Sequence, residues 1–240
     1  MKKNVMMRVA AMLLVCVMAT TCGISGTFAK YVSEKSNTAS ARVAKWGVEF
    51  VTASDNLFKP EYDYKTQPTG VVGTLSVKAD TDVVAPGTSG SGYTFTTNHP
   101  MGNPEVSYVV TFVAEAGYET IFVDTYFPVE FTLTLDGNDV VVSKDLGVIM
   151  TTLAQCQYMF DVSEGKYYVS DDGGATWTYT ANVPVLELSW NWEFYVNADC
   201  DTNDTKLGNL AAGYTLAQVG ATAANLEIAF TIVATATQID

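Results

Sequence analysis

The chain has 240 residues, of which 48% are hydrophobic, and its 26 acidic and 13 basic residues give a formal net charge of −13. A chain this acidic repels phosphate backbones and anionic lipid surfaces, so its composition argues against nucleic-acid binding and peripheral membrane association. Its length is sufficient for one domain with a full hydrophobic core.

The N-terminus has the pattern of an export signal, in which three basic residues precede an uncharged run that reaches Ala29. Thr27 and Ala29 are small residues at the positions three and one before a cut, which predicts that a signal peptidase removes residues 1–29. If cleavage failed, the uncharged run would be long enough to act as a membrane anchor. The mature chain would comprise an N-terminal segment, 30–43, and one domain, 44–240, with no membrane attachment.

Several segments alternate large apolar and polar side chains, which is the period of a half-buried β-strand. In chain order these segments are 46–50, 75–77, 93–95, 130–135, 186–194 and 226–232. The sequence Asp-Gly-Asn-Asp at 136–139 predicts a hairpin turn, because glycine and asparagine accept a positive φ. Many such strands, separated by Gly, Asp and Asn turns, predict an all-β antiparallel sandwich.

Two segments break this alternation and predict short helical insertions between strands. Residues 144–158 carry four apolar side chains at helical spacing, and Asp145 stands where it can cap the start of the helix. A second helix is expected over about 205–212. Residues 54–70, with two prolines and several charges, predict a long surface loop.

The sequence holds one histidine, His99, in a turn-like stretch at 97–100. A histidine-based zinc site needs a second imidazole, and no G-x-S-x-G nucleophile elbow accompanies His99 for a Ser-His-Asp triad. We therefore interpret His99 as a surface-turn residue and expect no enzymatic activity. Acidic residues are plentiful, so composition does not exclude a pair of carboxylates that hydrolyses glycosides.

The stretch SDDGGATW, which begins at Ser170, matches the S-x-D-x-G-x-T-W pattern called an Asp-box, best known from sialidases. A sialidase binds its substrate carboxylate with several arginines, whereas the mature chain keeps only Arg42. We interpret Ser170, Asp172, Gly174 and Trp177 as structural residues, with Asp172 bonded to turn amides and Trp177 packed beneath a hairpin. Contact with a sugar is the alternative interpretation.

Asp199, Asp201 and Asn203 place oxygen side chains at alternating positions, as the start of a calcium loop does. The glycine and glutamate that such a loop needs at its sixth and twelfth positions are replaced by Asp204 and Leu210. A solvated loop that caps the following helix is therefore the favoured interpretation. Calcium binding is the alternative, and we expect no other cofactor.

Two cysteines, Cys156 and Cys200, remain after the signal. In an oxidising exterior they could form a disulfide, and small buried free thiols are equally compatible with the sequence.

Short motifs along most of the chain resemble the TasA/camelysin family of exported bacterial proteins. They are GTFAKY at 26–31, ARVAKW at 41–46, VAPGTSGS at 84–91, WNW at 190–192, DTKLG at 204–208 and ATATQ at 234–238. The resemblance implies a jelly-roll sandwich exported to the matrix or surface of a Gram-positive bacterium. For the TasA branch it also implies assembly of identical subunits into extracellular biofilm fibres.

In those fibres the N-terminus released by cleavage is a strand that inserts into the next subunit. The equivalent segment here is 30–38, which opens with Lys30, Tyr31, Val32, Ser33, Glu34 and Lys35. A short extended segment can satisfy an open sheet edge through main-chain bonds, and such a head-to-tail contact propagates as a filament. From the residues alone, the alternative is a mobile polar tail.

Two other functions remain as alternatives to a structural fibre subunit. One alternative is a metallo-endopeptidase, because camelysin is described as a metalloprotease, although no recognised zinc motif is present in this chain. The other alternative is a surface module that binds glycans or proteins through the Asp-box face or the aromatic strand near Trp190.

Overall fold

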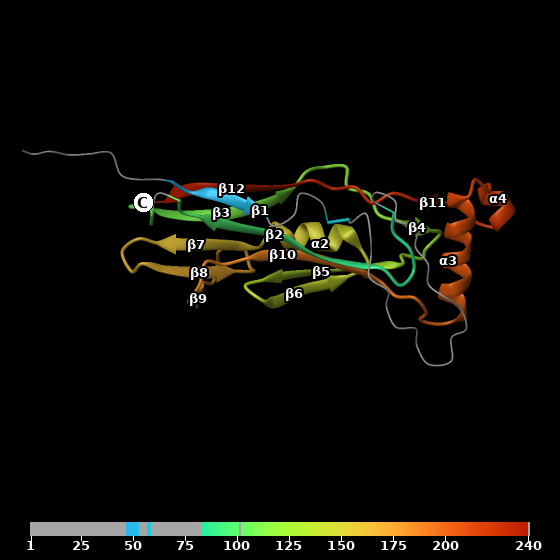
Figure 1. Ribbon diagram of the computed structural model, residues 1–240, viewed down its shortest axis with the longest axis horizontal. Helices are drawn as coiled ribbons and strands as arrows, with labels where there is room; N and C mark the ends of the chain where they lie inside the picture. The colour runs from blue at the N-terminus through green and yellow to red at the C-terminus, as the bar shows by residue number, and fades with distance from the viewer. Residues whose placement is uncertain (1–46, 53–56, 59–82, 101, 240) are drawn as a thin grey trace, which may run out of the picture. The chain divides into compact units, whose positions relative to one another are not determined.

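Two five-stranded antiparallel sheets pack face to face as a β-sandwich, which confirms the predicted fold class (Figure 1). This computed structural model describes residues 47–52, 57–58, 83–100 and 102–239, all within one unit, Ala44–Asp240. Met1–Val43 is a separate unit, so the predicted signal and the predicted donor strand lie outside the described residues. The predicted strand at 75–77 and nearly all of the predicted loop at 54–70 lie outside them as well.

The first sheet has the strand order β1-β2-β10-β5-β6 and the second has the order β12-β3-β7-β8-β9. The strands of the first sheet are β1 (Glu49–Thr52), β2 (Ser89–Asn98), β10 (Leu186–Trp192), β5 (Val129–Leu135) and β6 (Asn138–Ser143). Those of the second are β12 (Ile232–Ile239), β3 (Ser107–Ala114), β7 (Gln157–Asp161), β8 (Lys166–Ser170) and β9 (Thr178–Thr180). A separate short pair joins β4 (Phe122–Val123) to β11 (Ala224–Asn225).

The core between the two sheets follows from the alternation in their strands. β5 and β10 alternate buried and half-buried side chains along their whole length, because successive residues of a strand point to opposite faces. The rings of Phe95 in β2 and Phe112 in β3 meet across the core, with centroids 5.9 Å apart. Burying each large apolar side chain contributes roughly 1.5–3 kcal/mol, so the shared core holds the sheets together.

A two-residue turn joins β5 to β6, as the sequence predicted. Asp136 and Gly137 have φ angles of 51° and 78°. Positive φ at both central residues is the geometry of a type I′ hairpin, whose twist matches that of the flanking strands.

The first predicted helix is α2 (Leu146–Leu153), which connects β6 of one sheet to β7 of the other. Asp145 caps it, because its Oδ1 accepts a hydrogen bond from the Gly147 backbone N–H at 2.8 Å. The helix is shorter than predicted because Tyr158 and Phe160 belong to β7, where alternation places both side chains in the core.

The second predicted helix is longer than expected. α3 (Ala198–Ala211) begins well before the predicted start, because Asn197 Oδ1 accepts hydrogen bonds from the backbone N–H groups of Asp199 and Cys200, both at 3.0 Å. Acidic residues in its first turn also favour a helix N-terminus. Figure 1 shows α3 beside β4 and β11, followed by the short α4 (Leu216–Val219). Of the helices in the described ranges, none has the length and apolar character that crossing a bilayer requires.

The last strand corrects the prediction for the C-terminal region. β12 begins at Ile232, where the predicted strand was expected to end. Within the predicted stretch, Ala229 forms only an isolated bridge to Glu119, and Leu226 is exposed. Alternation alone does not make a strand, because the backbone also needs a partner to pair with.

Candidate functional site

The outer edge of β12 is the longest open strand edge among the described residues. β12 pairs with β3 over all eight of its residues, from Ile232 opposite Ala114 to Ile239 opposite Ser107. No described strand pairs with its other side. The outer edge of β12 therefore presents a row of main-chain donors and acceptors.

The register identifies which residues point their main-chain groups to this open side. Glu115 N donates to the carbonyl oxygen of Thr231 at 2.9 Å, and these residues continue the β3–β12 register as an opposed pair. Hydrogen-bonded and non-hydrogen-bonded pairs alternate in an antiparallel ladder. The N–H and C=O groups of Ala234, Ala236 and Gln238 therefore face away from β3.

The composition of β12 does not protect this edge from pairing with another strand. Its sequence, IVATATQI, contains neither a charged residue nor a proline. Ala234 and Ala236 pack against the core, whereas Val233 on the opposite face is 42% exposed. Charged residues, prolines, bulges and short length are the usual means by which a sheet edge avoids pairing with another chain.

The other edges in the described part of the chain have such protection. β9 contains only three residues, and β1 contains four, one of which is Glu49. β6 carries Asp139, and its pairing with β5 shifts register between Leu133 and Thr134. Among the described edges, β12 is thus the one best suited to accept a further strand.

The Asp-box residues form the hydrogen bonds of a tight turn between β8 and β9. Asp172 Oδ1 accepts from Ser170 Oγ at 2.7 Å and from Thr176 N at 2.9 Å, and its Oδ2 accepts from Thr176 Oγ1 at 2.6 Å. These bonds, led by those from Thr176, lower the pKa of Asp172 to about 2. The ring of Trp177 lies close to Gly174, because a Cβ placed on that glycine would be 3.4 Å from Trp177 Cζ2. Both carboxylate oxygens of Asp172 are therefore used within the turn.

The structure does not bring the predicted calcium ligands together. Asp199, Asp201 and Asn203 lie on α3 and not in a loop. Residues two apart on a helix point in nearly opposite directions, because each residue turns by about 100°. In the described part of the chain, no group of three His, Cys, Asp or Glu residues is placed to hold a metal ion.

The neighbouring Asp204 carries a contact that the sequence interpretation missed. Its Oδ1 accepts hydrogen bonds from Tyr126 Oη at 3.0 Å and from Trp192 Nε1 at 3.2 Å. Burial raises the pKa of Asp204 to about 6. The sequence signal was the helical spacing between Asp204 and Leu207, which places both on the inner face of α3.

The possible disulfide is not formed, because Cys156 and Cys200 are both free. Cys156 is buried after α2, where its Sγ lies 3.6 Å from the Thr152 carbonyl oxygen, and burial raises its pKa to about 12. Cys200 lies half-buried in the first turn of α3. Cys156 thus acts as a small core residue, the second of the two predicted states.

His99 is more than a surface-turn residue, because it joins the two sheets. It follows β2 of the first sheet, and its Nε2 lies 2.9 Å from Tyr108 Oη in β3 of the second. Its ring also stacks on that of Tyr167, with an interplanar angle of 6°. Burial lowers the pKa of His99, so the neutral imidazole serves this packing.

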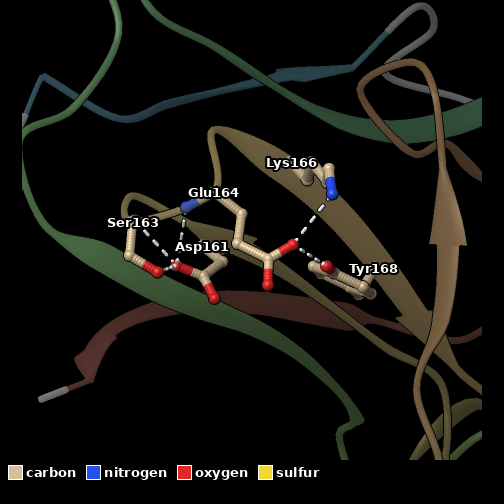
Figure 2. Close-up of polar contacts among 5 residues, drawn as sticks. All are labelled: Asp161, Ser163, Glu164, Lys166 and Tyr168. Carbon is tan, nitrogen blue, oxygen red and sulfur yellow. Dashed lines mark hydrogen bonds and ion pairs between the residues drawn. The ribbon is translucent and has the colours of Figure 1, made fainter.

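Figure 2 shows a polar cluster in the turn between β7 and β8. Asp161 Oδ1 accepts from Ser163 N and Ser163 Oγ at 2.8 and 2.7 Å. Glu164 Oε2 accepts from Lys166 Nζ at 3.0 Å and from Tyr168 Oη at 2.7 Å. All these contacts are exposed, and they shape the turn itself.

No protein-family model, curated protein or solved structure matches the chain. The resemblance to the TasA/camelysin family therefore stays a prediction that rests on the short motifs.

Proposed function

We propose that this protein is a secreted structural subunit that assembles with copies of itself by strand donation. In this proposal, residues 30–38 of one copy pair with the open edge of β12 in the next copy. The observation that carries the proposal is the open edge of β12, a strand of eight residues that contains neither a charged residue nor a proline. An added strand would form main-chain hydrogen bonds with Ala234, Ala236 and Gln238.

Charge supports the choice of the N-terminal segment as the occupant of this edge. Residues 30–45 contain four basic residues, Lys30, Lys35, Arg42 and Lys45, and one acidic residue, Glu34. Residues 46–240 contain 25 acidic and six basic residues. A basic segment is attracted to an acidic domain, which raises the rate of encounter and discourages contact between two domains without it.

The geometry of such a contact favours a filament over a closed dimer. The donated segment and β12 are different surfaces of the same chain, so the contact is heterologous. Each subunit that accepts a strand still has its own segment to donate. Assembly then continues head to tail, and removal of residues 1–29 would free the donor end.

A binding experiment tests this pairing directly. We expect a peptide of residues 30–45 to bind saturably to a chain that begins at Arg42, as measured by fluorescence anisotropy. Replacing Thr235 and Thr237, both exposed on β12, by lysine should weaken binding about tenfold or more, because a charged edge resists pairing with a basic strand.

Two controls separate strand pairing from general attraction. Thr178→Lys, compared with Thr235→Lys alone, adds the same single charge to β9, the opposite edge strand of the sheet, and should leave binding within about twofold. A scrambled peptide of the same composition should bind at least about tenfold more weakly, because the side chains that face the sandwich would be out of register. Equal binding of the scrambled peptide, or equal effects of both lysine positions, would refute pairing at β12.

A further inference from the structure

A cavity of about 470 Å³ lies between the inner face of α3 and the segment that follows β11. α3 contributes one wall with Asp204, Leu207, Gly208 and Ala211, which share one face because they are three or four residues apart. Residues 226–228 form part of the opposite wall, and Trp192 at the end of β10 also lines the space. This volume falls within the range of sites that hold small molecules.

The cavity combines apolar walls with negative charge. Trp192, Leu207 and Ile228 contribute apolar surface, and Asp204 and Glu227 are the acidic residues of the lining. No lysine, arginine or histidine is among the described residues that line it. An acidic lining without a basic residue disfavours anions and favours a cation.

Asp204, which lines the cavity, has hydrogen-bonding capacity left. Both of its hydrogen bonds, from Tyr126 and Trp192, go to Oδ1. Its Oδ2 accepts no hydrogen bond from any described residue. An ionised carboxylate accepts up to four hydrogen bonds, and placing one against apolar surface is costly without a positive charge close by. Lys144 lowers the pKa of Asp204 less than the hydrogen bonds from Tyr126 and Trp192 do, and it does not line the cavity.

We propose that this cavity binds a small organic cation with an apolar body, of the alkylammonium or arylammonium class. The ammonium nitrogen donates to Asp204 Oδ2, and the hydrocarbon part contacts Trp192, Leu207 and Ile228. This site is separate from the proposed strand-accepting edge, because no residue of β12 is among the described residues that line it.

Burial of Asp204 agrees with this assignment. The raised pKa of this carboxyl, about 6, reflects a poorly solvated charge. A bound cation would replace the lost solvation and form a charge-assisted hydrogen bond, which a neutral ligand cannot do. The site should therefore discriminate by charge among ligands of the same shape.

Calorimetry on the chain from Arg42, which contains every described lining residue and is expected to stay monomeric, tests the proposal, with phenethylammonium as the cation and 2-phenylethanol as its neutral counterpart. At about pH 7.5, where Asp204 is ionised, the ammonium should bind at least about tenfold more tightly than the alcohol. Asp204→Asn keeps the shape and an acceptor for Tyr126 and Trp192, and should reduce that preference to about twofold or less. Asp199→Asn removes the same charge from the first turn of α3, outside the cavity, and should leave the preference intact.

A second measurement locates the ligand independently of these variants. In an NMR titration, the indole N–H signal of Trp192, assigned by Trp192→Phe, should shift on addition of phenethylammonium. The proposal is overturned if no binding is detected at millimolar ligand, if the alcohol binds as tightly as the ammonium, or if Asp204→Asn keeps the full preference. It is also overturned if the ammonium binds without moving the Trp192 signal.

Discussion

The buried carboxyl of Asp204 should make the stability of the domain depend on pH in an unusual direction. Its pKa rises from an ordinary value of 3.8 to about 6 in the folded protein, chiefly through burial. Between these two values the folded state holds a proton that the unfolded state has released. The free energy of unfolding therefore gains from Asp204 below about pH 4, and this gain is lost as pH rises through about 6.

The magnitude follows from the size of this shift. Each pKa unit corresponds to about 1.4 kcal/mol, so two units would give about 3 kcal/mol for a fully buried group. Asp204 is only half-buried, and solvent screening reduces the expected effect to about 1 kcal/mol. Asp204→Asn removes the titration and keeps an oxygen to accept from Tyr126 and Trp192.

The assay is urea denaturation of the wild-type chain and of Asp204→Asn at about pH 4.5 and pH 7.5. From pH 7.5 to pH 4.5, the wild-type chain should gain about 1 kcal/mol relative to the variant. The other titrating groups are common to both proteins, so their contributions cancel in this double difference except for groups coupled to Asp204, such as Asp201. A difference of zero, or a relative loss at the lower pH, would show that Asp204 is not held in an apolar setting.

Three further predictions concern the core, the Asp-box turn and the cysteines. Leu133→Ala, at a fully buried position, should lower the free energy of unfolding by about 2–5 kcal/mol in urea denaturation. The control Val142→Ala, at a half-exposed position, should lower it by under about 1 kcal/mol. Equal losses in the two variants would contradict the described core. The pKa of Asp172 is lowered to about 2, so the amide NMR shifts of the β8–β9 turn should stay constant above about pH 4 and change as pH falls through about 2. A titration midpoint near pH 4 would contradict the hydrogen bonds described for Asp172. In the native chain, a thiol reagent should label Cys200 and leave Cys156 unlabelled until unfolding, because Cys156 is buried with a pKa of about 12; rapid labelling of both would place Cys156 outside the core.

Elements whose signals are local were predictable from the sequence. The alternation at 130–135 and 186–194 corresponds to β5 and β10, and the turn between β5 and β6 follows from Asp136 and Gly137. The cap of α2 was predictable for the same reason, because Asp145 bonds a backbone N–H only two residues away.

The start of α3 was missed although its signal is local: the stretch around Asp201 was interpreted as a loop, yet Asn197 caps a helix through it by accepting from a backbone N–H two residues away. Features that depend on distant partners were not predictable. Asp204 gains its contacts from Tyr126 and Trp192, which are remote from it in sequence. The open edge of β12 likewise depends on sheet order, which alternation in a single segment does not specify.

Strand donation predicts a sharp difference between two forms of the chain. Chains that begin at Lys30 and at Arg42 would be compared at equal concentration by light scattering and electron microscopy. The longer chain should form filaments, the shorter chain should stay monomeric, and Gln238→Pro in the longer chain should reduce filaments because it removes an outward N–H donor from β12. Filaments from both chains, or from neither over a range of pH and calcium concentration, would contradict assembly through residues 30–38.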